Sequence, residues 1–174
     1  MKKFISSIAF LFFIQLAVFA QKLSGFTVNM SSSGKAYLSI DHKKSYTKEQ
    51  AAAVKGNLDL MLLLSKEGNN DILEWYNLDR KHEKAPAELR GTKTAVVAIS
   101  FDRDQFDQCN TAADLKRMTG HLTVNSFSHF AVLKNGTGNW QHCFIIQQEN
   151  GKRALIYVSS IANSDELKVE VKSE

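Results

Sequence analysis

The chain has 174 residues, 44% of them hydrophobic, and its 22 Lys and Arg residues against 18 Asp and Glu residues give a formal net charge of +4 at pH 7. A chain of this length forms one domain and buries roughly two thirds of its unfolded surface, so its core does not depend on disulfides or metals. The small basic excess argues against a nucleic-acid partner, because the basic groups at 42–44 and 80–84 are interleaved with acids rather than clustered in a stripe.

Residues 1–20 have the features of a secretory signal peptide. Two lysines precede an apolar run over 4–20 that ends in the small residue Ala20, which predicts export and cleavage before Gln21. The run falls short of the about 20 apolar residues that a membrane span needs, so no span is expected after cleavage. The remaining domain, 21–174, carries a formal net charge of +2 and is expected in the periplasm or outside the cell.

The first elements of that domain are a strand and a short helix. Alternating apolar and polar residues over 35–41 predict a half-buried strand. Thr47 and Gln50 have the capping-box spacing that begins a helix. Gly56 is expected to end this helix in a left-handed conformation.

The rest of the chain predicts short strands with two more short helices. Asn150 and Gly151 lie between two predicted strands and indicate a type I′ hairpin turn, while Thr111 and Gly120 begin and end the last helix. Strands are expected over 58–65, 72–76, 92–101, 121–125, 129–134, 140–148, 153–159 and 166–172, and helices over 104–109 and 111–118. Because strands and helices do not alternate regularly, the pattern favours a mainly β fold, an antiparallel β-sandwich or strongly bent sheet with two or three short helices in its connections.

The sequence contains no established catalytic or metal-binding motif. Cys143 beside His142 and Ser128 beside His129 are neighbours along predicted strands, so each pair points to opposite faces and cannot act as nucleophile and base. His121, His129 and His142 lie on consecutive predicted strands, but ordinary surface or half-buried histidines explain them without a metal. No catalytic residue, metal or cofactor is therefore assigned, although a catalytic site assembled from separate strands stays open.

Aromatic side chains are the candidate binding residues. Trp75 and Tyr76 are adjacent, so one faces inward and the other outward, and Trp140 follows a glycine-rich turn close to His142. Exposed aromatic rings at strand edges suit stacking on sugars or contact with a protein partner. The alternative is that these rings belong to the core of the sandwich.

Two cysteines, Cys109 and Cys143, remain in the exported domain. Export permits a disulfide between them, and the closed loop of about 34 residues would then stabilise the fold by roughly 4 kcal/mol. Two buried free thiols that act as small apolar side chains are the alternative.

Several short segments resemble uncharacterised small β-rich proteins exported by Bacteroidota-type bacteria. The similar segments are Ala-Tyr-Leu-Ser-Ile-Asp at 36–41, Tyr-Thr-Lys-Glu-Gln-Ala-Ala-Ala at 46–53, Asn-Leu-Asp-Leu-Met at 57–61 and Phe-Asp-Gln-Cys-Asn-Thr-Ala-Ala-Asp-Leu at 106–115. The resemblance covers half of the exported domain and implies a β-rich fold and an envelope location. It brings no catalytic residue with it.

These observations together favour a non-enzymatic exported β-sandwich domain that binds a glycan or a protein partner at the cell envelope. A small exported hydrolase whose site converges from separate strands is the alternative. The ligand and the oligomeric state are not determined by the sequence.

Overall fold

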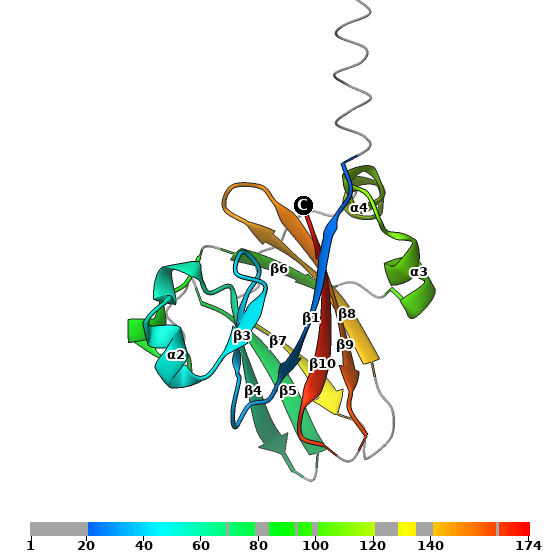
Figure 1. Ribbon diagram of the computed structural model, residues 1–174. Coiled ribbons are helices and arrows are strands. Elements are labelled where there is room, and N and C mark those ends of the chain that lie inside the picture. Colours follow the sequence, from blue (N-terminus) through cyan, green and yellow to red (C-terminus); the bar gives the residue numbers. More distant parts are fainter. Residues whose placement is uncertain are drawn as a thin grey trace, which may run out of the picture.

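The computed structural model describes residues 21–174 except 69, 79–83, 93, 99–100, 121–128, 135–140 and 163 (Figure 1). Within these residues the chain forms ten strands and three α-helices, which confirms a mainly β fold with short helices. The proposed signal peptide, the strand expected over 121–125 and the side chain of Trp140 lie outside the described residues.

The strands form two five-stranded sheets in which every neighbouring pair is antiparallel. The first sheet has the order β1 (Ser24–Met30), β10 (Leu167–Ser173), β9 (Arg153–Ser160), β8 (Gln141–Gln148) and β6 (Thr94–Ala98). The second has the order β3 (Lys44–Tyr46), β2 (Tyr37–Ser39), β4 (Leu60–Glu67), β5 (Asn70–Asn77) and β7 (His129–Lys134).

The two sheets pack face to face around one apolar core. Because side chains alternate between the faces of a strand, every second residue points between the sheets. Trp75 of the second sheet packs against Phe144 of the first, with ring centroids 5.2 Å apart. The other members of this core come from both sheets and include Met30, Leu38, Leu60, Leu62, Leu73, Ile146, Ile156, Val158, Val169 and Val171. The predicted antiparallel sandwich is therefore confirmed.

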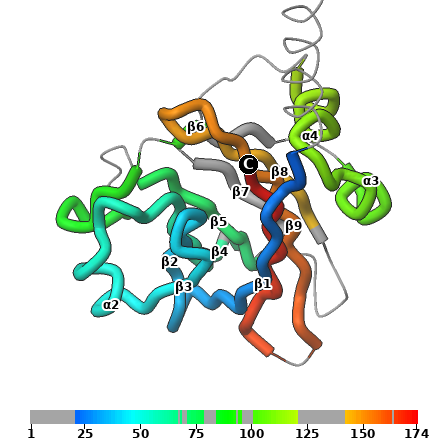
Figure 2. Tube along the Cα trace, turned by 45° about the horizontal axis from the view of Figure 1, so that its top comes forward, coloured from blue at the N-terminus to red at the C-terminus, as the bar shows by residue number. Residues whose placement is uncertain are grey.

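Helical segments cover the outer faces of both sheets (Figures 1 and 2). The second sheet carries α2 (Lys48–Ala52) and the 3-10 turns η1 (Lys55–Asn57) and η2 (Ala87–Leu89), whose cluster includes Tyr37, Ala51, Leu58, Met61, Tyr76 and Leu89. The first sheet carries α3 (Arg103–Gln108) and α4 (Ala112–Thr119), whose cluster includes Phe106, Leu115, Cys143, Leu155 and Tyr157. Because α2, η1 and η2 cover the outer face of the second sheet, both faces of β4 are packed, and its sequence from Leu60 is nearly continuously apolar rather than alternating.

Capping boxes begin the three helices. In each helix the capping side chain accepts a bond from the N3 main chain, and the N3 side chain accepts one in return. The capping box predicted at Thr47 and the cap predicted at Thr111 are confirmed. The left-handed end predicted at Gly56 is wrong, because α2 ends at Ala52 with Ala53 as its right-handed C-cap, and Asn57 N then donates to Val54 O at 2.8 Å in η1.

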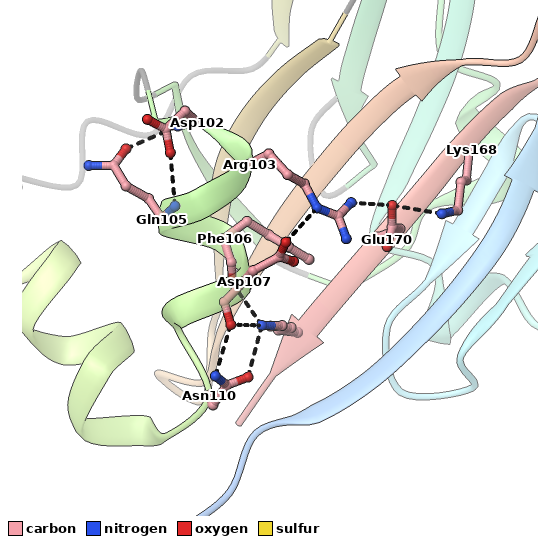
Figure 3. A network of polar contacts seen from close by, with 9 residues as sticks. Asp102, Arg103, Gln105, Phe106, Asp107, Asn110, Lys168 and Glu170 are labelled. Carbon is pink, nitrogen blue, oxygen red and sulfur yellow. Dashed lines mark hydrogen bonds and ion pairs between the residues drawn. The ribbon is translucent and has the colours of Figure 1, made fainter.

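Figure 3 shows how polar contacts attach α3 to β10. Arg103 pairs with Glu170 of β10 at 2.6 Å and with Asp107 of its own helix at 2.9 Å. Lys172 Nζ donates to two main-chain carbonyl oxygens at the C-terminal end of α3, at 2.7 and 3.1 Å, and to the Asn110 side chain at 3.0 Å. A cation at that end of a helix satisfies carbonyl groups that have no partner within the helix.

The hairpin between β8 and β9 has a different turn from the one predicted. Gly151 N donates to Gln148 O, and Gln148 N donates to Lys152 O, both at 2.9 Å. Gly151 has φ of 84°, but Asn150 does not have a positive φ. The side-chain oxygen of Asn150 accepts a bond from Lys152 N at 2.9 Å in a local turn. The hairpin is confirmed, but it contains a three-residue loop with glycine in the left-handed position instead of a type I′ turn.

Candidate functional site

An open hollow of about 570 Å³ lies at one end of the sandwich. Four connections meet there: the turn after β2, η1, the segment that leads into β6 and the turn between β8 and β9. We call it the polar hollow, and its lining residues are Asp41, Gly56, Gly91, Thr92, Gln148, Glu149 and Asn150. The lining therefore consists of carboxylates, carboxamides, a hydroxyl group and glycine.

A fully buried carboxylate, Asp59, connects the residues beneath this hollow. Its Oδ2 accepts a bond from Ile40 N at 2.8 Å. Its Oδ1 accepts bonds from Thr92 Oγ1 at 2.7 Å, Gln148 Nε2 at 3.0 Å and Thr94 Oγ1 at 3.3 Å. We call these five residues the Asp59 cluster. Since Asp59 precedes β4 and Gln148 ends β8, the cluster joins the two sheets.

Burial determines the protonation behaviour of Asp59. Loss of solvation raises the pKa of its carboxyl group, because the charged form is disfavoured away from water. The hydrogen bonds from Gln148, Ile40 and Thr92 act in the opposite direction but are smaller effects, and the negative charge of Asp41 raises the pKa of Asp59 further. The polar groups around Asp59 therefore offset part of the cost of burying it.

Glycine at position 91 allows the hollow to form. A Cβ atom at Gly91 would lie 1.8 Å from the main-chain oxygen of Leu58, which is far inside van der Waals contact. Because Gly91 has no side chain, its segment packs directly on the start of β4, with Thr92 N donating to Leu58 O at 2.7 Å and Gly91 N donating to Leu78 O at 3.1 Å. This close approach brings Thr92 to the carboxylate of Asp59.

Two of the three predicted aromatic binding residues, Trp75 and Tyr76, do not reach the surface, and the third, Trp140, lies outside the described residues. Trp75 and Tyr76 point to opposite faces of β5, as expected, but both are 0% exposed. Trp75 lies in the core between the sheets, and Tyr76 is covered by the helical layer over the second sheet. An exposed stacking surface at these two residues is therefore a wrong prediction, because the outer face of β5 is not solvated.

The predicted binding residue His142 lies at the opposite end of β8 from the polar hollow. Trp75 Nε1 donates to His142 Nε2 at 3.0 Å, and the His142 ring stacks on Phe144 with centroids 6.0 Å apart. Burial lowers the pKa of His142 to about 4, so the imidazole is neutral at pH 7. Its separation of six strand residues from Gln148, roughly 20 Å, keeps it out of the hollow.

The two cysteines are free and buried, and they belong to the same apolar cluster on the outer face of the first sheet. Burial raises the pKa of Cys143 to about 12 and also raises the pKa of Cys109. Both thiols are therefore protonated at pH 7 and act as small apolar groups. The structure contains no disulfide between these two residues, and their pairing in the exported protein stays a prediction.

The chemistry available at the polar hollow is hydrogen bonding. The residues that line it include no cysteine, histidine or lysine. Over the described part of the chain, no group of three His, Cys, Asp or Glu side chains could hold a metal ion. None of the helices within the same residues is long and apolar enough to cross a membrane.

Sequence analysis did not identify the Asp59 cluster. One signal was present, because Asp59 interrupts an apolar segment between Leu58 and Leu60, where a charged residue requires hydrogen-bonding partners. The partners themselves could not be deduced, since Thr92 and Gln148 are 33 and 89 residues away along the chain.

Comparisons of the chain with protein-family models, with curated proteins and with solved structures find no match. The function is therefore inferred from the geometry and chemistry of the polar hollow.

Proposed function

We propose that this protein is a non-catalytic binding domain that holds a neutral, hydroxyl-rich ligand, a glycan, in the polar hollow. The observation that carries the proposal is the composition of the lining, where two carboxylates, two carboxamides and a hydroxyl group surround glycine main chain. Pockets for drug-like ligands are mostly apolar. A lining of this kind instead suits a ligand with many hydroxyl groups, because carboxylates and carboxamides form several hydrogen bonds each.

The floor of the hollow supports binding because it is ordered before a ligand arrives. Asp59 accepts bonds from four groups, and these come from both sheets. A preorganised site loses less conformational entropy when it binds than a site that has to be ordered by its ligand.

The proposed setting is the periplasm or the cell surface. The basic start and apolar run within residues 1–20 have the composition of a secretory signal peptide. An exported protein of this kind would meet envelope glycans directly. A hydrolytic role, the alternative, would have to use the carboxylates that line the hollow, Asp41 and Glu149, because Asp59 is fully buried and cannot contact a substrate.

Binding can be tested with four neutral tetrasaccharides, built from cellulose, xylan, amylose and chitin units. The purified protein is titrated with each one up to millimolar concentration while its ¹H–¹⁵N NMR spectrum is recorded. We expect at least one of them to shift the main-chain amides of residues 148–151 in a saturable way. No saturable shift with any of the four, or the appearance of shorter sugars, would overturn the proposal.

A matched pair of variants tests whether the hollow is the binding site. Asn150→Asp keeps the oxygen that accepts from Lys152 N but removes the side-chain donor, so we expect binding to weaken about tenfold. Gln108→Glu makes the same change from carboxamide to carboxylate at an exposed position of α3 and should leave the affinity unchanged. Equal losses in the two variants would place the ligand elsewhere.

A further inference from the structure

We propose that Asp59 sets the hydrogen-bonding polarity of the polar hollow, by holding Gln148 with its carboxamide oxygen toward the ligand. This inference rests on the proposed binding function and specifies the ligand further. The group that reaches the floor of the hollow has to be a hydrogen-bond donor, a hydroxyl or an N–H.

The orientation of Gln148 follows from the chemistry of its partner. Asp59 Oδ1 accepts from two threonine hydroxyls and from Gln148 Nε2, the last at 3.0 Å. The nitrogen of the Gln148 carboxamide, and not its oxygen, therefore faces Asp59. Because the carboxamide is planar, Oε1 is directed away from Asp59.

The Gln148 oxygen is an acceptor available to a ligand. Gln148 lines the hollow although only 7% of it is exposed, and among the described residues none donates to its Oε1. Oε1 is not among the fully buried polar atoms that lack a partner, so it is within reach of solvent and of a ligand in the hollow. A carboxamide oxygen accepts hydrogen bonds and cannot donate them, so this floor favours a ligand donor over a ligand acceptor.

Thr92 adds a second acceptor at the floor. Its hydroxyl group has one hydrogen, and the two strongest acceptors within reach are Asp59 Oδ1 at 2.7 Å and Leu58 O at 3.1 Å. The hydrogen is used inside the protein in either case, so Thr92 can offer only its lone pairs to the hollow. Gln148 and Thr92 therefore both present hydrogen-bond acceptors at the floor of the hollow.

The substitution Asp59→Asn should reverse this polarity with little change of shape. Its oxygen can still accept from Ile40 N, while its nitrogen faces the three groups that formerly donated to Oδ1. That nitrogen has two hydrogens, one for the Gln148 oxygen once its carboxamide turns over and one for a threonine hydroxyl. The second threonine hydroxyl can bond to the first, which lies 3.2 Å away. The floor would then present the nitrogen of Gln148 as a donor.

The orientation is tested first in the protein without ligand. In the wild type, the Gln148 side-chain NH₂ should exchange with solvent at least about tenfold more slowly than the NH₂ of exposed Gln108, and Asp59→Asn should remove this protection. Asp165→Asn is the control, because it removes one carboxylate at an exposed position outside the hollow, and it should leave the exchange unchanged. Protection that persists in Asp59→Asn, or is absent from the wild type, would overturn the inference while leaving the proposed function standing.

Selectivity is tested with the tetrasaccharide that binds most tightly and its fully O-methylated form, which keeps the oxygen acceptors but lacks hydroxyl donors. We expect the wild type to prefer the free sugar at least tenfold and Asp59→Asn to lose that preference. Asp165→Asn, at an exposed position outside the hollow, should keep the preference, and an equal loss in both variants would assign the effect to the removed charge and overturn the inference. Gln148→Met supplies a second test if Asp59→Asn does not fold, since loss of Oε1 should also abolish the preference, and an unchanged preference would contradict the proposal.

If the Gln148 exchange behaves as expected but the protein binds none of the four sugars, only the proposed glycan-binding function is overturned. The orientation of Gln148 would then still stand. The two proposals therefore fail in distinguishable ways.

Discussion

At each end of β8, one side chain forms a hydrogen bond to the opposite sheet, but the two bonds lie in different surroundings. At one end Gln148 reaches across to Asp59, and at the other His142 accepts a bond from Trp75. Both β8 side chains face the second sheet, with Phe144 and Ile146 between them. One end contains a carboxylate among four donors, whereas the other contains a neutral ring among aromatic groups.

The difference has opposite consequences for stability as the pH changes. The pKa of Asp59 is raised above its ordinary value of 3.8, so this group favours folding most at low pH, and its contribution is lost as the pH rises through the folded-state pKa. The pKa of His142 is lowered from 6.5 to about 4, so its contribution is present above pH 6.5 and is lost as the pH falls toward 4. As the pH falls, Asp59 therefore contributes more to the free energy of unfolding and His142 contributes less.

The largest effect is expected from removal of the carboxylate. Asp59→Ala leaves four buried or partly buried donors without their acceptor and should lower the free energy of unfolding by about 3–5 kcal/mol. Denaturant unfolding at pH 7 measures it, with the exposed Asp41→Ala expected to stay within about 0.5 kcal/mol of the wild type. Similar midpoints for the two variants would contradict the role of the Asp59 cluster as a connection between the sheets.

Close packing at the same end of β8 should be nearly as sensitive. Gly91→Ala forces a methyl group against the main chain of Leu58 and should lower the free energy of unfolding by about 2–3 kcal/mol. Gly56→Ala is the matched control in the same hollow, because no atom lies within 4 Å of the added carbon, and it should change stability little. If the two variants unfold together, the close approach of Gly91 to β4 is wrong.

The neutral state of His142 should be visible in the pH dependence of stability. Between pH 7.5 and pH 5, the lowered pKa of His142 should reduce the free energy of unfolding of the wild type by about 2 kcal/mol more than that of His142→Phe. The exposed His42→Phe serves as the control and should retain the wild-type slope. Parallel slopes for the wild type and His142→Phe would show that this histidine is not held in its neutral form.

A smaller effect is expected in the turn that follows Gln148. Gly151 has φ of 84° with no atom close to a prospective Cβ, so only backbone strain opposes a side chain there. Gly151→Val should lower the free energy of unfolding by about 1–2 kcal/mol, because β-branched residues resist this conformation. An unchanged denaturant midpoint would contradict the left-handed position assigned to Gly151.

Local signals predicted the elements more successfully than their surroundings. The capping boxes at Thr47 and Thr111 and the hairpin before Arg153 depend on residues a few positions apart, and all three are present. The strand β1 was not predicted, although Phe26 and Val28 alternate with polar residues and pack against the core. This strand of seven residues is short and half polar, so its sequence pattern is weak, and its partner β10 lies at the other end of the chain.

The candidate site could not be predicted because it depends on contacts between distant segments. Tyr76 faces outward from its sheet as its position in the strand requires, but only the fold reveals the helical layer that covers it. Asp59 was visible as a polar residue in an apolar segment, yet its pairing with Thr94 and Gln148 depends on the packing of one sheet on the other. A single sequence holds no local pattern for such an arrangement.

The pairing of β1 with β10 has a consequence for how the chain folds during synthesis. Met30 lies opposite Leu167, and Asn29 donates to Glu166 across a separation of 137 residues. The helix α3 likewise depends on β10, through Glu170. A ribosome therefore releases most of the chain before β1 and α3 have their partner. Because contacts this distant form slowly, we expect the nascent chain to remain open until β10 has emerged.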